Sequence, residues 1–371
     1  ENMVWLVSRD VTLPDGTVET VLVPQVYLKK DSLQLDGSGA LLSGQKIQLT
    51  VKDDVTNSGR LIGGDVSVFA NNITQQSGHV QGDTVTLNAK NDLIQQGGSV
   101  QANQSLAMVA GNNLTIGSST RDTKNQAGNN QFSSTYLSDQ ASVYVGGKDG
   151  KLTLQAGNDV TLTAAAIGAQ GENSQIAVEA GRNLQLSTVK TQASEYTEAG
   201  NNHRITRTSS QDIGASVQGN GTVTLNAGQD ITATAATVSA GKALTVTAGR
   251  DITVAAGEQN QTHDEYHKVT GGNGALSKTT TETQFAYDRT TANSSTLSGD
   301  SVTLASGRDM TVSGSNVMAD NDVTVQAGRD LTVTTADENN TEHHYKKETT
   351  SGITSSGGIG FTAGKSQMKQ T

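Results

Sequence analysis

Short segments in which apolar residues alternate with threonine, serine or glutamine recur along most of the chain. Glycine, asparagine or aspartate bounds each of them, as in residues 249–254, which read Gly-Arg-Asp-Ile-Thr-Val. Alternation with a period of two between turn residues is typical of β-strands, and no stretch has the spacing of an amphipathic helix. The pattern predicts a protein built from short strands and turns.

The strands come in pairs that follow one another at a constant interval. Val223 and Ile231 begin the two strands of one pair, eight residues apart, and the next pair begins thirteen residues later at Leu244, which gives a period of 21 residues. Such a period favours a chain wound into coils that stack about 4.8 Å apart. We expect an all-β fold, namely a right-handed parallel β-helix with protruding excursions that resemble β-hairpins.

A Gly-x-Asp corner recurs at the same place in the coil. We expect its glycine to adopt a positive φ, and its aspartate to bond to neighbouring backbone and to stack on its counterpart one coil away. The predicted corner residues are Gly157, Asp159, Gly228, Asp230, Gly249, Asp251, Gly307, Asp309, Gly328 and Asp330.

Four polar segments interrupt the stack of coils. They hold five of the six histidines and nine of the twelve aromatic residues. Insertions into a solenoid project from one face and often carry its contacts. The predicted organisation is a lead-in at 1–40, the first coils at 41–117, and a continuous solenoid at 118–371 with excursions at 118–150, 188–221, 257–300 and 335–371.

The aromatic and histidine side chains of these excursions are the predicted partner contacts. For each of them the alternative role is packing against the outside of the rod. The candidates are Tyr136, Tyr196, His263, Tyr266, His267, Tyr287, His343, His344, Tyr345 and Phe361.

Two histidines four residues apart, His263 and His267, have the spacing at which a helix presents two zinc ligands. Their surroundings are strand-like and no third ligand follows, so we predict neither a metal site nor a bound cofactor. Histidines that titrate near neutral pH and alter the excursions are a further hypothesis.

Composition narrows the possible functions. A net charge of −10 argues against nucleic-acid binding, and the absence of cysteine excludes a disulfide framework. No apolar run reaches the length of a membrane-spanning helix. Only two prolines occur, both before the first coil, as expected when strands are paired on both sides.

Enzymes that cleave polysaccharides also use parallel β-helices, and they cluster carboxylates on one exposed strand face. Here the acidic residues recur singly at corners, and the outward strand positions are mostly threonine, glutamine and asparagine. We therefore expect a structural and interaction module without enzymatic activity.

Several segments together resemble a known family. The units of the type at 248–254, the closing segment 351–364, and the opening segments 10–16 and 22–27 are similar to the hemagglutinin-repeat region of two-partner-secretion exoproteins. This family includes the filamentous hemagglutinins and the contact-dependent growth-inhibition proteins of the CdiA type.

The resemblance implies a secreted rod on the bacterial cell surface that contacts a target cell and takes part in toxin delivery across its outer membrane. The implied partners are an outer-membrane transporter of the two-partner type during export, the target-cell envelope or a receptor on it, and adjacent domains of the same exoprotein. A passive spacer or adhesive rod of a filamentous hemagglutinin is the alternative. The chain is expected to be a piece of a longer protein.

Overall fold

A computed structural model describes residues 3–12, 18–27, 39–272, 277–355 and 361–370, with side chains from residue 39 onward except 201 and 354–363. The chain divides into two compact units, Glu1–Ala40 and Leu41–Thr371. The first unit contains an antiparallel hairpin of β1 (Met3–Thr12) and β2 (Val18–Tyr27). Pro24 is tolerated in β2 because each strand of a two-stranded sheet keeps one unpaired edge.

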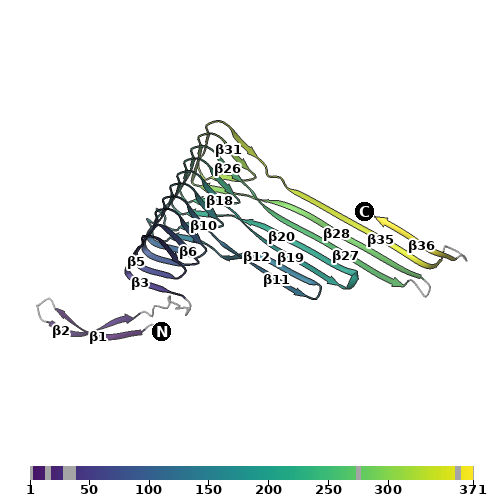
Figure 1. The fold of residues 1–371 in the computed structure, drawn as a ribbon, viewed down its shortest axis with the longest axis horizontal. Helices are drawn as coiled ribbons and strands as arrows, with labels where there is room; N and C mark the ends of the chain where they lie inside the picture. The colour runs from purple at the N-terminus through teal and green to yellow at the C-terminus, as the bar shows by residue number, and fades with distance from the viewer. Residues whose placement is uncertain (1–2, 13–17, 28–38, 273–276, 356–360, 371) are drawn as a thin grey trace. The chain divides into compact units, whose positions relative to one another are not determined.

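The second unit is a parallel β-helix, as predicted, and its coils run along three faces (Figure 1). The first face is a ten-stranded parallel sheet. Its strands are β4 (Asp54–Asn57), β6 (Asn72–Gln76), β8 (Leu93–Gln96), β10 (Leu114–Gly117), β15 (Val160–Thr163), β18 (Leu184–Ser187), β23 (Ile231–Thr234), β26 (Ile252–Ala255), β31 (Met310–Ser313) and β34 (Leu331–Thr334).

The other two faces belong to a sixteen-stranded parallel sheet that branches at β9. Before the branch lie the long strands β3 (Leu41–Thr50), β5 (Arg60–Ala70), β7 (His79–Ala89) and β9 (Ser99–Ala110). One branch contains β13 (Ser142–Val145), β16 (Ala166–Ala169), β21 (Ser216–Gly219), β24 (Thr237–Ala240), β29 (Thr296–Gly299) and β32 (Asn316–Ala319). The other contains β14 (Lys151–Ala156), β17 (Gln175–Ala180), β22 (Thr222–Ala227), β25 (Ala243–Ala248), β30 (Ser301–Ser306) and β33 (Val323–Ala327).

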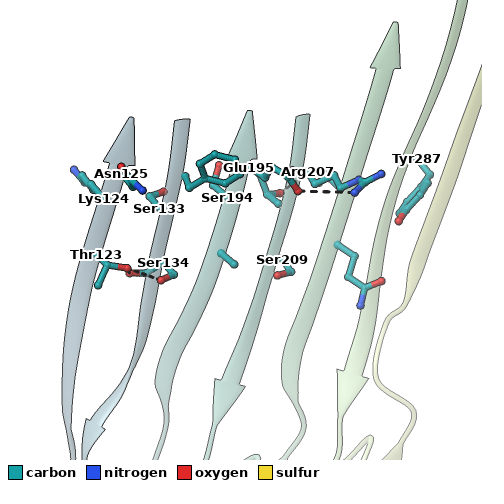
Figure 2. A pocket seen from close by; sticks show the side chains of 15 residues that line it. Thr123, Lys124, Asn125, Ser133, Ser134, Ser194, Glu195, Arg207, Ser209 and Tyr287 are labelled. Atoms are coloured by element: carbon teal, nitrogen blue, oxygen red, sulfur yellow. Dashed lines mark hydrogen bonds and ion pairs between the residues drawn. The ribbon is translucent and has the colours of Figure 1, made fainter. Parts of the chain in front are cut away.

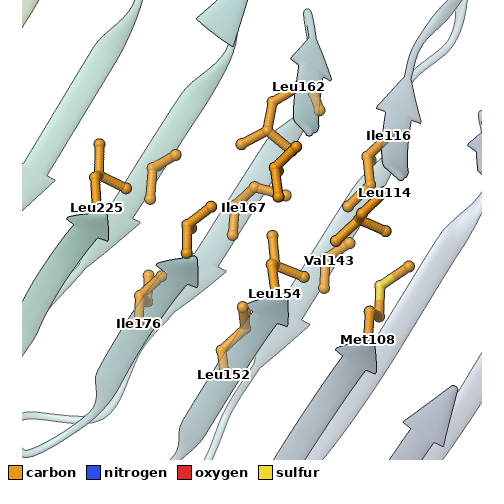
Figure 3. Packing of buried hydrophobic residues seen from close by; sticks show 14 of the residues in the cluster. Met108, Leu114, Ile116, Val143, Leu152, Leu154, Leu162, Ile167, Ile176 and Leu225 are labelled. Carbon is orange, nitrogen blue, oxygen red and sulfur yellow. The ribbon is translucent and has the colours of Figure 1, made fainter. Parts of the chain in front are cut away.

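The core is a set of aliphatic stacks inside the coils (Figure 3). One stack places five inward residues in register on successive strands, each at most 1% exposed: Leu152, Ile176, Val223, Leu244 and Val302. Burying each such side chain contributes about 1.5–3 kcal/mol relative to leaving it in water. Among the described side chains, no phenylalanine, tyrosine or tryptophan belongs to this core.

The corner glycines are required for a different reason from the one predicted. Gly157, Gly228, Gly249, Gly307 and Gly328 do not adopt positive φ, so that expectation was wrong. A Cβ on any of them would collide with the carbonyl oxygen of the glycine at the same corner of the neighbouring coil, such as Gly181 beneath Gly228. Glycine is therefore selected by the close approach of two backbones.

The corner aspartates bond to the next coil. Asp159 accepts a hydrogen bond of 3.0 Å from the backbone amide of Asn183 and one of 2.9 Å from Nε of Arg182, and Nη2 of Arg182 bonds to its second oxygen. The same fork joins Arg250 to Asp230. It recurs where Arg308 bonds to Asp251 and Arg329 to Asp309. Where the x residue of a corner is arginine, it thus clamps the aspartate of an adjacent coil.

These clamps predict how stability depends on pH. The bonded guanidinium lowers the pKa of Asp159, Asp230, Asp251 and Asp309. A carboxyl whose pKa is lower in the folded chain stabilises the fold above its ordinary pKa, about 4, and this contribution is lost as the pH falls. We expect the melting temperature, followed by circular dichroism, to drop between pH 5 and pH 3.

The double variant Arg250→Gln/Arg308→Gln should show a shallower drop, because two of the clamped carboxyls lose their partner. Lys90→Gln/Lys151→Gln removes two exposed charges elsewhere and is the matched control. An equally steep acid transition in both variants would mean that the clamps do not set the pH dependence.

Candidate functional site

The excursions are four antiparallel hairpins. Their strands are β11 (Ser119–Ala127) with β12 (Asn130–Asp139), β19 (Val189–Ala199) with β20 (His203–Ile213), β27 (Gly257–Gly272) with β28 (Ser277–Asn293), and β35 (Asn339–Ser355) with β36 (Phe361–Gln370). A single 3₁₀ turn, η1 (Gly200–Asn202), connects β19 to β20. The remaining residues of the predicted excursion ranges include coil strands such as β13, which carries Tyr144.

All four hairpins leave the solenoid at the same corner and join into one eight-stranded sheet (Figure 1). They follow β10, β18, β26 and β34, which are alternate strands of the ten-stranded face. Two coils advance about 9.6 Å, twice the distance between neighbouring strands, and a two-stranded hairpin is equally wide. Successive hairpins therefore meet edge to edge, as β12 with β19, β20 with β27 and β28 with β35.

One side of this sheet, which we call the histidine face, carries an ordered row of side chains across five strands. The registers align Phe132, Glu195, Arg207, His263 and Tyr287, and alternation along each strand places them on the same side. Glu195 and Arg207 lie 3.8 Å apart at the centre of the row. An aromatic ring stands near each end of this ion pair.

A shallow cavity of about 560 Å³ lies beside this row (Figure 2). Its wall includes Phe132, Arg207 and Tyr287, and small side chains such as Ser134 and Ser209 line it one step closer to the solenoid. A second hollow of about 370 Å³ shares Ser134 and Ser209 and extends to Tyr136. Together they form a trough that runs across the strands and is lined by hydroxyl, amide and aromatic groups.

A cluster of imidazole and aromatic rings begins at His263 and Tyr287 of this row and extends along the same face. His263, 9% exposed, stacks on Tyr287 with ring centres 5.4 Å apart. Nε of Arg207 donates to its Nδ1 at 3.3 Å, so Nε2 carries the proton and faces Glu265 at 3.4 Å. The ring centres of His203 and His267 lie 4.2 Å apart. Phe285 links the cluster to His344, whose ring centre lies 4.8 Å from that of Phe285.

The opposite side, which we call the lysine face, has a different chemistry. Tyr266 and Tyr345 lie there, with the guanidinium of Arg204 5.9 Å from the ring centre of Tyr266. Glu282 forms ion pairs with Lys268 at 3.0 Å and Lys347 at 3.7 Å. The bond from Lys268 lowers the pKa of Glu282, and the same bond raises the pKa of the Lys268 ammonium.

The predicted contact residues are thus divided between two surfaces. Tyr136, His263, His267, Tyr287 and His344 lie on the histidine face. The lysine face holds Tyr196, whose hydroxyl donates to Glu198 at 3.2 Å, together with Tyr266, His343 and Tyr345. Phe361 begins β36, and its side chain lies outside the described residues.

The sequence reasoning missed six residues that complete the row and the ring cluster: Phe132, Glu195, His203, Arg207, Glu265 and Phe285. For Phe132, Glu265 and Phe285 the signal was parity, because each is an even number of residues from a chosen residue on its own strand. The other three had no such signal, because Tyr196, the chosen residue of their hairpin, lies on the opposite face. His263 and His267 lie on a strand, where residues four apart are separated by about 13 Å, so they do not have the helical zinc geometry. In the described part of the chain no group of three acidic, histidine or cysteine side chains could hold a metal ion.

Among the described residues no helix has the length and hydropathy needed to cross a membrane. A family model described as Hemagglutinin repeat matches residues 58–133, 197–347 and 276–371. A curated relative, the tRNA nuclease CdiA of Yersinia mollaretii, is 31% identical over an alignment of 244 positions, and the match covers 58% of this chain and 8% of the relative. The chain thus spans a small part of that protein. No solved structure matches.

Proposed function

Because the chain belongs to the hemagglutinin-repeat family and is a rod segment of a large secreted exoprotein of the adhesin or growth-inhibition type, we propose that its hairpin sheet is the surface that contacts a target-cell envelope. The coils supply length and rigidity through their aliphatic core. The sheet supplies a lateral surface on which aromatic, histidine and charged side chains are held in register.

The observation that carries this proposal is the joining of four hairpins into one sheet. A passive spacer requires only the coils, whereas the hairpins add eight strands outside the core and collect nearly all the aromatic residues of the second unit. Four of the five predicted corner aspartates, by contrast, are engaged by arginines of the neighbouring coil. This supports a structural role for the coils and a contact role for the sheet.

The relative bears the name of a tRNA nuclease. We infer that in a parent protein with such a toxin the sheet takes part in delivering it across the outer membrane of the target cell. Export through an outer-membrane transporter of the two-partner type, and docking to adjacent domains of the same exoprotein, belong to the same proposal. In a filamentous hemagglutinin the sheet would serve adhesion.

The test is to replace Gly257–Asn293 by a short linker in the full-length exoprotein. This removes β27 and β28 and, with them, His263 and Tyr287. Target-cell binding, corrected for the amount of exoprotein on the surface, should fall at least about tenfold, as on loss of a dominant contact.

Removal of the edge hairpin Ser119–Asp139 is the matched control, because the other three hairpins remain paired, and its effect should be smaller. If binding and toxin delivery are unchanged after removal of Gly257–Asn293, the rod is a passive spacer.

A further inference from the structure

The outer part of the lysine face is strongly basic, although the chain as a whole has a net charge of −10. The registers place five lysines on one side of the four strands β27, β28, β35 and β36: Lys268, Lys278, Lys347, Lys365 and Lys369. The lysines form two rows. Lys268, Lys347 and Lys369 share one row with Glu282, and Lys278 and Lys365 share the other with Ser351.

Glu282 is the one carboxylate among the described side chains of this block, which leaves an excess of four positive charges. Between the two lysine rows lies a row of neutral side chains: Thr270, Thr280, Thr349 and Gln367. The same stretch of the histidine face carries one lysine, Lys346, and one glutamate, Glu348, so it is neutral. The charge is therefore concentrated on one side of the sheet.

The patch is broad and regular. Three strand spacings span about 14 Å, and the two lysine rows lie four residues, about 13 Å, apart. Lys278, Lys365 and Lys369 are exposed, and Lys268 and Lys347 are partly exposed. At the inner edge Tyr266 and Tyr345 follow the first lysine row, and the ammonium of Lys369 lies 5.5 Å from the ring centre of Tyr345.

We propose that this patch, residues Lys268, Lys278, Lys347, Lys365 and Lys369, docks on a lipid surface whose phosphate-bearing headgroups have a net negative charge. A sheet face presents all five ammonium groups to a plane of phosphates at once. Lysine is a point charge that suits phosphate without requiring one orientation. Tyrosine at the rim of a cationic surface suits the boundary between water and headgroups.

The choice of a lipid partner rests on the proposed function of contact with a target-cell envelope. A nucleic-acid strand is less favoured, because it would follow one line of phosphates and meet only one lysine row. Attraction of each lysine to an anionic surface strengthens binding about fivefold and is screened by salt within a Debye length.

The experiment uses the chain of residues 1–371 and co-sedimentation with vesicles. Vesicles of phosphatidylglycerol and phosphatidylcholine in equal parts should bind the chain at low salt, and vesicles of phosphatidylcholine alone should not. The variant Lys278→Gln/Lys347→Gln/Lys365→Gln/Lys369→Gln keeps the Lys268–Glu282 pair and should bind at least about tenfold more weakly.

A second variant provides the control for net charge. Lys46→Gln/Lys90→Gln/Lys151→Gln/Lys346→Gln removes the same number of exposed lysines from other surfaces and should bind within about twofold of the parent chain. Equal weakening in both variants, or no binding to anionic vesicles, would overturn the proposal. Binding of a single-stranded oligonucleotide without binding to vesicles would also overturn it, in favour of a nucleic-acid partner.

Failure of this proposal can be distinguished from failure of the proposed function. If the chain does not bind anionic vesicles, but removal of Gly257–Asn293 still abolishes target-cell binding, the sheet contacts a component of the envelope other than anionic lipid. If the chain binds anionic vesicles but removal of Gly257–Asn293 leaves target-cell binding unchanged, the lysine patch binds lipid without contributing to contact with the target cell.

Discussion

Gly228→Ala is expected to destabilise the solenoid by about 3 kcal/mol, at the upper end of the cost of overpacking. The new methyl group would collide with the carbonyl of Gly181, and the two coils are held together there by backbone bonds, including that from the Gly228 amide to Ala180 at 2.9 Å. The collision is relieved only if the two coils move apart, and this movement breaks several such backbone hydrogen bonds. Denaturant unfolding followed by circular dichroism measures the loss.

Gly271→Ala is the matched control, because a Cβ at that position in β27 has no atom within 4 Å and the residue does not have a positive φ. Its effect should be below about 0.5 kcal/mol, as for an ordinary surface substitution. A similar unfolding midpoint for the two variants would mean that the coils do not approach each other at the corner as described.

The solenoid could be read from the sequence because strand alternation and turn residues repeat at a constant interval. The prediction of a positive φ at the corner glycines was wrong because the same sequence, a glycine shortly before an aspartate, occurs both in left-handed turns and where two backbones approach closely. Only the position of the neighbouring coil distinguishes the two, as at Gly228 over Gly181.

The joining of the hairpins was also missed, although a signal for it existed. The hairpins begin 70, 68 and 82 residues apart at Ser119, Val189, Gly257 and Asn339, each interval holding two coils and one hairpin. Two coils rise by about the width of two strands. A hairpin after every second coil therefore lies at the height at which it pairs edge to edge with the next hairpin. The alternation within one hairpin does not reveal it.

The division of the site into two faces required the register between hairpins. Parity along β27 separates His263 and His267 from Tyr266 and Lys268. It does not say which residues of β20 and β28 stand beside them. Arg207 and Tyr287 reach His263 only because the three strands are aligned as they are, and the lysine patch depends on the same alignment.

The central claim, that the hairpins form one sheet in a fixed register, is tested most directly by disulfide formation across a boundary between hairpins. The chain has no cysteine, so any disulfide within a double variant must join the two introduced residues. Ser134 and Ala193 are directly opposite on β12 and β19. Opposed residues of antiparallel strands have Cα atoms about 4.5–5.5 Å apart, within the range of a disulfide.

We expect Ser134→Cys/Ala193→Cys to close almost completely under mild oxidation, measured by mass spectrometry of proteolytic fragments. Ser134→Cys/Ser194→Cys should stay largely reduced, because the second side chain points to the other face. If neither pair closes, or both close equally, the hairpins are independent arms and the continuous contact surface does not exist.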